Sequence, residues 1–231
     1  MRFLFLIILV FLTGCKSSGP VAKYTQYCQP IVITEKGKQI ISDFQIGSAI
    51  NEMNTFWKCT DIQFKSLGII NLEKPEWLIL DSSDSNVWKF LNDYAQNYDA
   101  IPILLCKEIH FPEYDSVWGL ASYSSGFIAA DYPFLGSTFA HEMGHVWGLP
   151  HIWEDEKEKR IGINDTPGKE EYVCNSPFIM SYCAGRVFPW SKKGAFSPDQ
   201  IKFLQNQADK HLPFIPSSIL TYDLDWRVDV N

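Results

Sequence analysis

The sequence has no apolar run long enough to cross a membrane as a helix. The run at its start, Phe3–Leu12, has ten residues, whereas a transmembrane helix needs about twenty. Arg2 precedes this run, so we expect residues 1–14 to be a signal peptide for export. Basic residues are also few, with 20 Lys and Arg against 27 Asp and Glu and a net charge of −7. This acidic balance argues against nucleic acid as a partner.

Internal repeats, low-complexity blocks and linkers between domains are also missing, apart from the polar segment 16–22. The chain has 231 residues, of which 46% are hydrophobic and 20% charged. This length and composition are those of one globular domain with a buried core. We expect a tether over residues 15–29, one folded domain over 30–215, and a tail over 216–231.

The end of the signal peptide, Leu12-Thr13-Gly14-Cys15, resembles a bacterial lipobox. The resemblance implies that Cys15 is acylated and becomes the first residue of the mature protein, with Lys16–Pro20 as a flexible tether. A lipid-anchored protein of this kind would lie in the bacterial cell envelope, on the outer membrane or the outer face of the plasma membrane. The alternative is a plain signal peptide that ends near a cysteine.

The chain has six cysteines, so an odd number remains after the lipobox. In an exported protein these residues can pair. Cys174 and Cys183 form the best candidate disulfide because they are close in sequence across a turn-rich segment. Cys106 lies in an apolar run and is expected to be a buried thiol. For Cys28, a disulfide with Cys59, a free thiol and a thiol that caps the metal described below remain open.

Hydrophobic periodicity predicts an α+β fold with a twisted mixed sheet and an irregular C-terminal part. The run Ala100–Cys106 is almost purely apolar, as in a central strand covered on both faces. The charged run Glu154–Arg160 is interpreted as a solvated loop. Helices are expected at 42–57, 85–98, 137–147 and 197–210, and strands at 31–34, 61–70, 77–80, 100–106, 118–122 and 127–130.

Three of the five histidines lie within the eleven residues HEMGHVWGLPH, which begin at His141. On a helix His141 and His145 share one face, because they are four positions apart. Gly148 can adopt a positive φ and end the helix, which turns His151 back toward that face. Glu142 is rotated by about 100° from His141, so it would lie beside a bound metal without binding it.

Three imidazoles and one open position are typical of a catalytic zinc site, since a structural site has four protein ligands. Zinc lowers the pKa of its water and polarises a carbonyl, and Glu142 would serve as general base and return the proton to the leaving amine. The alternatives are ordinary histidines or a zinc site without activity. The other two histidines, His110 and His211, are interpreted as structural.

The pattern HExxHxxGxxH followed by Phe178-Ile179-Met180-Ser181-Tyr182 resembles the metzincin metallopeptidases. The resemblance implies a two-lobed catalytic domain over residues 30–215. It also implies that Met180 forms the hydrophobic floor below the zinc in a tight turn. Tyr182 would lie near the metal and help to stabilise the oxyanion.

Within the metzincins the chain looks most like the pappalysin group, over roughly residues 30–208. This resemblance implies that the strand with Gly119, Leu120 and Ala121 is the edge that pairs with an extended substrate; an ordinary edge strand is the alternative. The stretches that carry the resemblance are Ile50–Asn54, Ile62–Phe64, Gly119–Ala121, Asp165–Pro167 and Phe196–Gln200.

The chain departs from the group before Asp165, where Gly162-Ile163-Asn164 stands in place of a Gly-Asp pair. Asn164 and Asp165 could offer oxygens to Ca²⁺, but a plain turn is the favoured interpretation. Arg186, just past the Met-containing turn, could line the specificity pocket or lie on the surface.

The sequence therefore predicts a zinc-dependent endopeptidase, monomeric and lipid-anchored, that hydrolyses proteins or peptides bound in extended form. Two alternatives remain at this point. One is an inactive zinc-binding lipoprotein that serves as a binding module. The other is an amidase that acts on cell-wall peptides.

Overall fold

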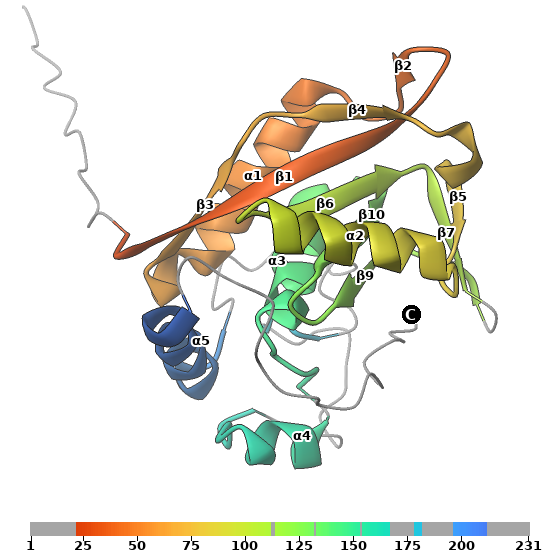
Figure 1. Cartoon of the computed structure of the whole chain (residues 1–231). Coiled ribbons are helices and arrows are strands. Elements are labelled where there is room, and N and C mark those ends of the chain that lie inside the picture. Colours follow the sequence, from red (N-terminus) through yellow and green to blue (C-terminus); the bar gives the residue numbers. More distant parts are fainter. Residues whose placement is uncertain are drawn as a thin grey trace, which may run out of the picture.

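In the computed structural model, residues 22–111, 114–131, 133–152, 154–166, 178–181 and 196–211 are described. They form a mixed sheet with helices on both faces (Figure 1). The strands β1, β6 and β10 are parallel at its centre, and β9 is antiparallel at one edge. The sheet order is β2 (Lys38–Gln39), β1 (Tyr24–Glu35), β6 (Ile101–Cys106), β10 (Gly126–Ala130) and β9 (Gly119–Ser122), with β3 (Ile62–Ser66) and β4 (Ile70–Glu73) also paired to β1.

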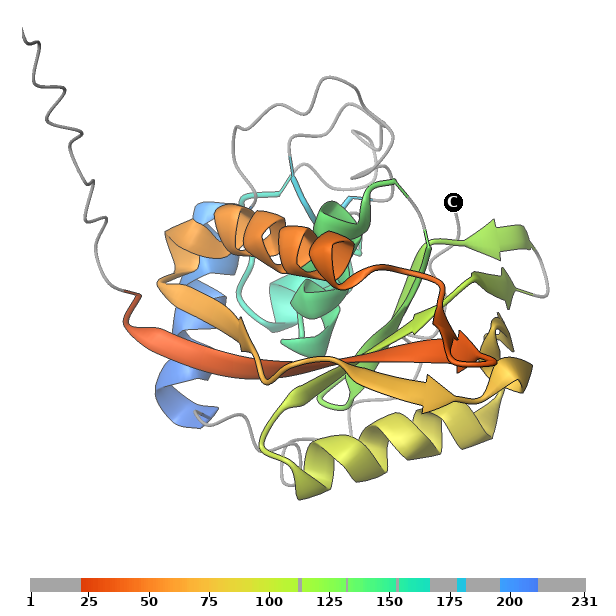
Figure 2. The same cartoon turned by 90° about the horizontal axis from the view of Figure 1, so that it is seen from above.

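The helices α1 (Asp43–Trp57) and α3 (Leu135–Val146) cover one face of this sheet, and α2 (Ser85–Asn97) covers the other (Figure 2). A second sheet contains β5, β7 and β8. The remaining elements are η1 (Lys58–Thr60), η2 (Pro75–Trp77), β5 (Ile79–Asp81), β7 (Glu108–Phe111), β8 (Tyr114–Val117), α4 (Asp155–Arg160) and α5 (Pro198–His211).

Strand β6 is buried along its whole length, as its apolar run predicts. Its side chains alternate between the two faces, because successive residues of a strand point in opposite directions. Ile103 and Leu105 belong to the core below α1 and α3, and Leu104 and Cys106 to the core below α2. The strand therefore contributes side chains to both helical layers, and α3 packs on the neighbouring strands β10 and β9.

The predicted helix ends at Ser42 and Ser197 are confirmed. The Ser42 hydroxyl oxygen accepts a hydrogen bond from the backbone N–H of Gln45, and the side-chain oxygen of Gln45 accepts one from the backbone N–H of Ser42. Ser197 and Gln200 form the same reciprocal pair at the start of α5. Such a capping box satisfies backbone N–H groups that a helix leaves without partners.

Two expectations about secondary structure are wrong. The strand expected over 61–70 is two strands, because Gly68 has a φ of +112° and breaks the extended backbone between β3 and β4. The charged run 154–160 contains helix α4, in which Glu158 is only 1% exposed and accepts a hydrogen bond from Thr166.

Strand β1 begins at Tyr24, earlier than the predicted domain start at residue 30. It is anchored there because Tyr24 donates its backbone N–H to Asp61 and pairs with Ile62 of β3. Residues 24–29 therefore belong to the sheet and not to the tether. Among the described residues, no helix is long and apolar enough to cross a membrane.

The three cysteines in the described ranges are free thiols, so Cys28 and Cys59 do not form a disulfide. Cys28 lies in the core below α1 and is not among the metal-binding side chains. Burial raises the pKa of both Cys28 and Cys106 to about 12, so these thiols stay protonated at neutral pH. The predicted pair Cys174 and Cys183 lies outside the described residues.

Candidate metal centre

Helix α3 carries the first two histidines and ends as the sequence predicts. Gly148 has a φ of +91°, which a side chain would make costly. Its N–H donates to His145, and the N–H of Leu149 donates to Gly144. These two bonds form a Schellman motif, which satisfies the last carbonyls of a helix and reverses the chain. The reversal brings His151 back over the helix.

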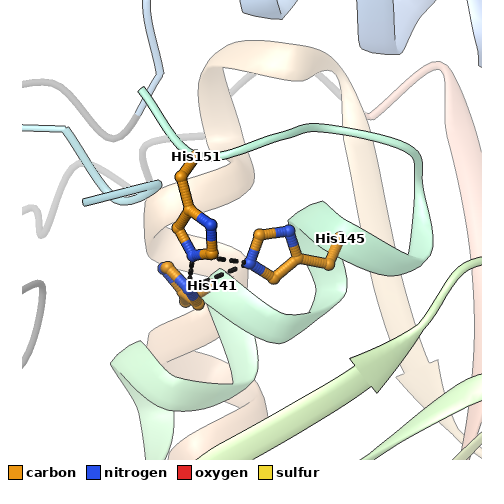
Figure 3. Close-up of side chains that lie close together, drawn as sticks. All are labelled: His141, His145 and His151. Atoms are coloured by element: carbon orange, nitrogen blue, oxygen red, sulfur yellow. Dashed lines mark hydrogen bonds between the residues drawn. The ribbon is translucent and has the colours of Figure 1, made fainter. Parts of the chain in front are cut away.

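The three imidazoles point toward one another (Figure 3). The Nε2 atom of His145 lies 3.1 Å from that of His141 and 3.0 Å from that of His151, and the third distance is 3.2 Å. His141 and His145 come from α3, and His151 comes from the segment after it. The structure therefore brings together the three residues that the sequence predicts as metal ligands.

The rings of the two helical histidines are oriented by backbone carbonyls. The Nδ1 atom of His141 is 2.6 Å from the oxygen of Ile179, and that of His145 is 2.8 Å from the oxygen of Leu149. A carbonyl only accepts hydrogen bonds, so each Nδ1 carries the proton and donates it. Each Nε2 then directs a lone pair toward the centre of the cluster, where a cation would stabilise it.

This arrangement fits zinc. Zinc binds histidine nitrogen at about 2.0–2.1 Å in tetrahedral geometry, which places two ligand nitrogens about 3.3 Å apart. The observed separations of 3.0–3.2 Å are close to that value. Among the described side chains, these three histidines form the group that could hold a metal ion.

Burial favours the neutral form of the third ligand. His151 is 3% exposed. Desolvation, and then the charges of His145, His141 and Lys157, hold the pKa of His151 well below its usual value. A neutral imidazole keeps the lone pair that a metal needs. Glu154 accepts a hydrogen bond from the backbone N–H of His151 and is itself bound by Lys157.

The Met-containing turn lies against the metal-binding helix. The N–H of Ser181 donates to Phe178, which closes a tight turn, and Met180 is fully buried. A side-chain carbon at Gly144 would lie 3.0 Å from the Cε atom of Met180. The Met180 side chain therefore packs directly against α3 at Gly144. The carbonyl of Met180 also accepts from Ile152. The turn therefore contacts α3 and the segment that carries the third ligand.

Glu142 lies on the side of α3 that faces strand β9. It is 6% exposed, and a side-chain carbon at Gly119 would lie 2.7 Å from its Cγ atom and 2.8 Å from its Cδ atom. A side chain at this position would force the Glu142 carboxylate or the strand to move. The sequence assigned Gly119 to substrate binding, and the structure adds that it contacts Glu142.

Strand β9 is an edge of the main sheet, as expected for the strand near residues 118–122. The N–H of Ala130 donates to Trp118, so alternate residues of β9 point their backbone groups toward β10. By this alternation the backbone groups of Gly119 and Ala121 point away from β10. Leu120 is different, because its backbone pairs with Ile128 and its side chain lies in the core below α2.

The hairpin between β9 and β10 is fastened to the end of α3. The N–H of Ser124 donates to the carbonyl of Val146. A side-chain carbon at Gly148 would lie 2.7 Å from the ring of Tyr123, so this ring packs on the turn after the helix. The edge strand is thus held against the metal-binding helix near both of its ends.

Other residues that the sequence singles out either are outside the described part of the chain or lie on other elements. Tyr182, Arg186 and Cys15 lie outside the described residues. His110 is on β7, where its Nε2 atom is 3.0 Å from the carboxylate of Glu108. Asp165 accepts the N–H of Asp199 at the start of α5, and Asp199 accepts that of Asn164. These hydrogen bonds fit a plain turn, which the sequence favours over a calcium-binding site.

Glu154 and Lys157 were missed by the sequence analysis. Both residues belong to the charged run interpreted as a solvated loop, although Glu154 lies only three positions after His151. The signal that could have found them is the spacing Glu154–Lys157, which places both side chains on one side of a helical turn. The conclusion that this turn faces His151 needed the tertiary structure.

A family model described as Peptidase M66 matches residues 93–163, which include the three histidines and β9. No curated protein sequence matches the chain. Mature mirolysin from Tannerella forsythia, solved in complex with a cleaved peptide, has a similar structure, with a TM-score of 0.52 and 19% identity over 80% of this chain and 92% of that one.

Two further solved structures are similar. Metalloproteinase-II from Bacteroides fragilis has a TM-score of 0.50 and 14% identity, over 82% of this chain and 55% of that one. Archaemetzincin from Methanopyrus kandleri has a TM-score of 0.48 and 15% identity, over 80% and 96%. The match to a peptidase family across the metal centre, the shared fold and the convergent histidines lead to one conclusion: this chain is a zinc metallopeptidase with a metzincin-like α+β fold.

Proposed function

We propose that the protein is an endopeptidase that cleaves extended peptide segments, with Glu142 as its general base. The observation that carries this proposal is the position of Glu142, which follows His141 on α3 and is buried against the edge strand β9. A carboxylate in that position would be available both to a water on the metal and to a peptide added to the strand.

Strand β9 supports an extended mode of substrate binding. The backbone N–H and C=O groups of Gly119 and Ala121 that point away from β10 could donate and accept hydrogen bonds from a peptide that adds to the sheet as a further strand. Within the described ranges β9 pairs with β10 and with no other strand. Such binding relies on main-chain hydrogen bonds, so it suits substrates of varied sequence.

The chemistry then divides among few residues. His141, His145 and His151 would hold the zinc, which when bound would lower the pKa of a coordinated water and polarise the scissile carbonyl. The carboxylate of Glu142 takes the proton of the attacking water and later donates it to the leaving amine. By resemblance to the metzincins, Tyr182 donates a hydrogen bond to the developing oxyanion.

Digestion of a complex peptide mixture tests the proposal. The protein lacking residues 1–20 would be incubated with peptides derived from a proteome, and new termini would be read by mass spectrometry. We expect internal cleavages that disappear in Glu142→Ala, because general acid–base catalysis contributes about 10²–10⁴-fold to the rate. Zinc-loaded protein that produces no new termini would contradict the endopeptidase. Release of peptides from peptidoglycan alone would instead support an amidase.

We also propose that the protein is anchored through a lipid at Cys15 in a bacterial cell envelope. The support is the sequence Leu12-Thr13-Gly14-Cys15 and the polar segment after it. More than one acyl chain would make such attachment stable. Incorporation of labelled palmitate into the full chain, lost in Cys15→Ser, would support acylation. A Cys15→Ser protein that stays equally in the membrane fraction would contradict it.

A further inference from the structure

Glu154 makes two backbone contacts with the third metal ligand. Its N–H donates to the carbonyl of His151 at 3.0 Å, and its carboxylate Oε2 accepts the N–H of His151 at 3.2 Å. Glu154 therefore engages both backbone groups of one residue. These two bonds fix the main chain from which the imidazole of His151 extends.

The same carboxylate oxygen also lies near the imidazole itself. It is 3.8 Å from Nδ1 of His151, the ring nitrogen opposite to the one that faces the other histidines. The second oxygen, Oε1, accepts a hydrogen bond of 2.6 Å from the ammonium group of Lys157. The Glu154 side chain is 20% exposed and that of Lys157 is 34% exposed, so solvent only partly screens this arrangement.

The third ligand thus differs from the other two. Neutral backbone carbonyls lie next to Nδ1 of His141 and His145, whereas an acidic side chain lies beside Nδ1 of His151. At 3.8 Å the carboxylate is beyond hydrogen-bond distance of the ring, so it acts on His151 through its charge and through the two backbone bonds. Outer groups that orient a ligand imidazole strengthen metal binding. Lys157 holds the carboxylate in place, because it binds the oxygen that does not face His151.

We propose that Glu154, held by Lys157, is a positioning residue that orients His151 and strengthens zinc binding. The inference rests on the proposed zinc centre and goes beyond it, since it assigns a function to the first turn of α4. Glu154 acts on the metal only through His151. Replacement of Glu154 should therefore weaken zinc binding and leave substrate recognition unchanged once zinc is bound.

Zinc affinity of the purified full chain tests the proposal, measured by competition with a chromogenic chelator after the metal has been removed. Glu154→Gln keeps an oxygen for the N–H of His151 but loses the charge, and Glu154→Ala loses both. Glu156→Gln is the matched control, because Glu156 is exposed on the same helix. We expect zinc affinity to fall about 10-fold for Glu154→Gln and up to about 100-fold for Glu154→Ala, with the control unchanged.

A second measurement separates positioning from folding. The urea midpoint of the metal-free protein should be the same for wild type and Glu154→Gln, since the backbone bond to His151 remains. At saturating zinc, the KM for a peptide substrate should also be unchanged, because the proposed role of Glu154 is to position His151. A loss of zinc affinity in Glu154→Gln that merely follows a lower stability of the metal-free protein would overturn the inference.

The outcomes also separate this inference from the proposed function. Wild-type protein that binds no zinc would refute the metal centre itself. Wild-type protein that binds one zinc per chain, with Glu154→Gln equally tight, would refute only the role of Glu154. Lys157→Met provides a further check: it should weaken zinc binding less than Glu154→Ala, because the carboxylate remains but is no longer held.

Discussion

The contact between Gly119 and Glu142 predicts that a single added carbon disables Glu142, the residue proposed as general base. In Gly119→Ala the new carbon would lie 2.7 Å from Cγ of Glu142, whereas ordinary contacts begin at 3.4 Å. The carboxylate must therefore retreat by roughly 0.7 Å, or β9 must shift by a similar amount. A displacement of about 1 Å at a reacting group can cost on the order of 100-fold in rate.

The assay is the cleavage rate of a peptide identified in the mass-spectrometric screen, at saturating zinc. We expect Gly119→Ala to lower this rate about 100-fold while one zinc per chain is retained, because the substitution does not touch the three histidines. Gly47→Ala is the control, because it makes the same substitution at a position where nothing lies within 4 Å of the added carbon.

A double substitution decides how Gly119 acts. If it acts through Glu142, then Gly119→Ala should cost little more once Glu142 has been replaced by Ala, because residues that share one function are not additive. Equal losses in the presence and absence of Glu142 would refute this reasoning. They would show instead that the substitution blocks the substrate at β9.

Three other substitutions test the packing and the charges. Gly144→Ala should lower the free energy of unfolding by about 1–3 kcal/mol in urea titrations, because its new carbon would press on Met180; an unchanged midpoint would contradict the contact. Gly47→Ala, on an exposed part of α1, should raise it by about 0.5–1 kcal/mol, and a decrease would count against this helix. Burial raises the pKa of Cys28 and Cys106 from 9.0 to about 12. Between pH 9 and 12 these thiols therefore stay protonated in the folded state but lose their protons in the unfolded state. The free energy of unfolding should fall over this range by about 1.4 kcal/mol per thiol for each pH unit. A double Cys28→Ala, Cys106→Ala protein should show a smaller alkaline decline. In the wild type, thiol titration should detect neither residue before unfolding.

The metal ligands could be predicted from the sequence because their geometry is local. His141 and His145 are one helical turn apart, and a glycine with positive φ is enough to return His151. The helix starts at Ser42 and Ser197 were equally readable, since a capping box is a contact between residues three positions apart. The apolar run of β6 also predicted its burial on both faces.

Errors arose where the outcome depended on distant residues. The run 154–160 consists of charged residues, yet Glu158 is buried because Thr166 and the chain after the helix fold over it. The tether was assigned six residues of β1 because a strand of mixed polarity is stabilised only once β3 pairs with it. Leu120 was grouped with Gly119 and Ala121, although the alternation of a strand sends its side chain to the opposite core.

By itself the sequence determined the type of metal centre, its three ligands and the adjacent carboxylate, because these depend on helical periodicity and one chain reversal. Only the tertiary structure decided what surrounds them. It placed Gly119 against Glu142, Met180 beneath Gly144 and Glu154 beside His151. The first two contacts join segments far apart in sequence, and the third depends on how the chain folds after the last ligand. No local pattern specifies them, since they form only when the sheet, α3 and the Met-containing turn pack together.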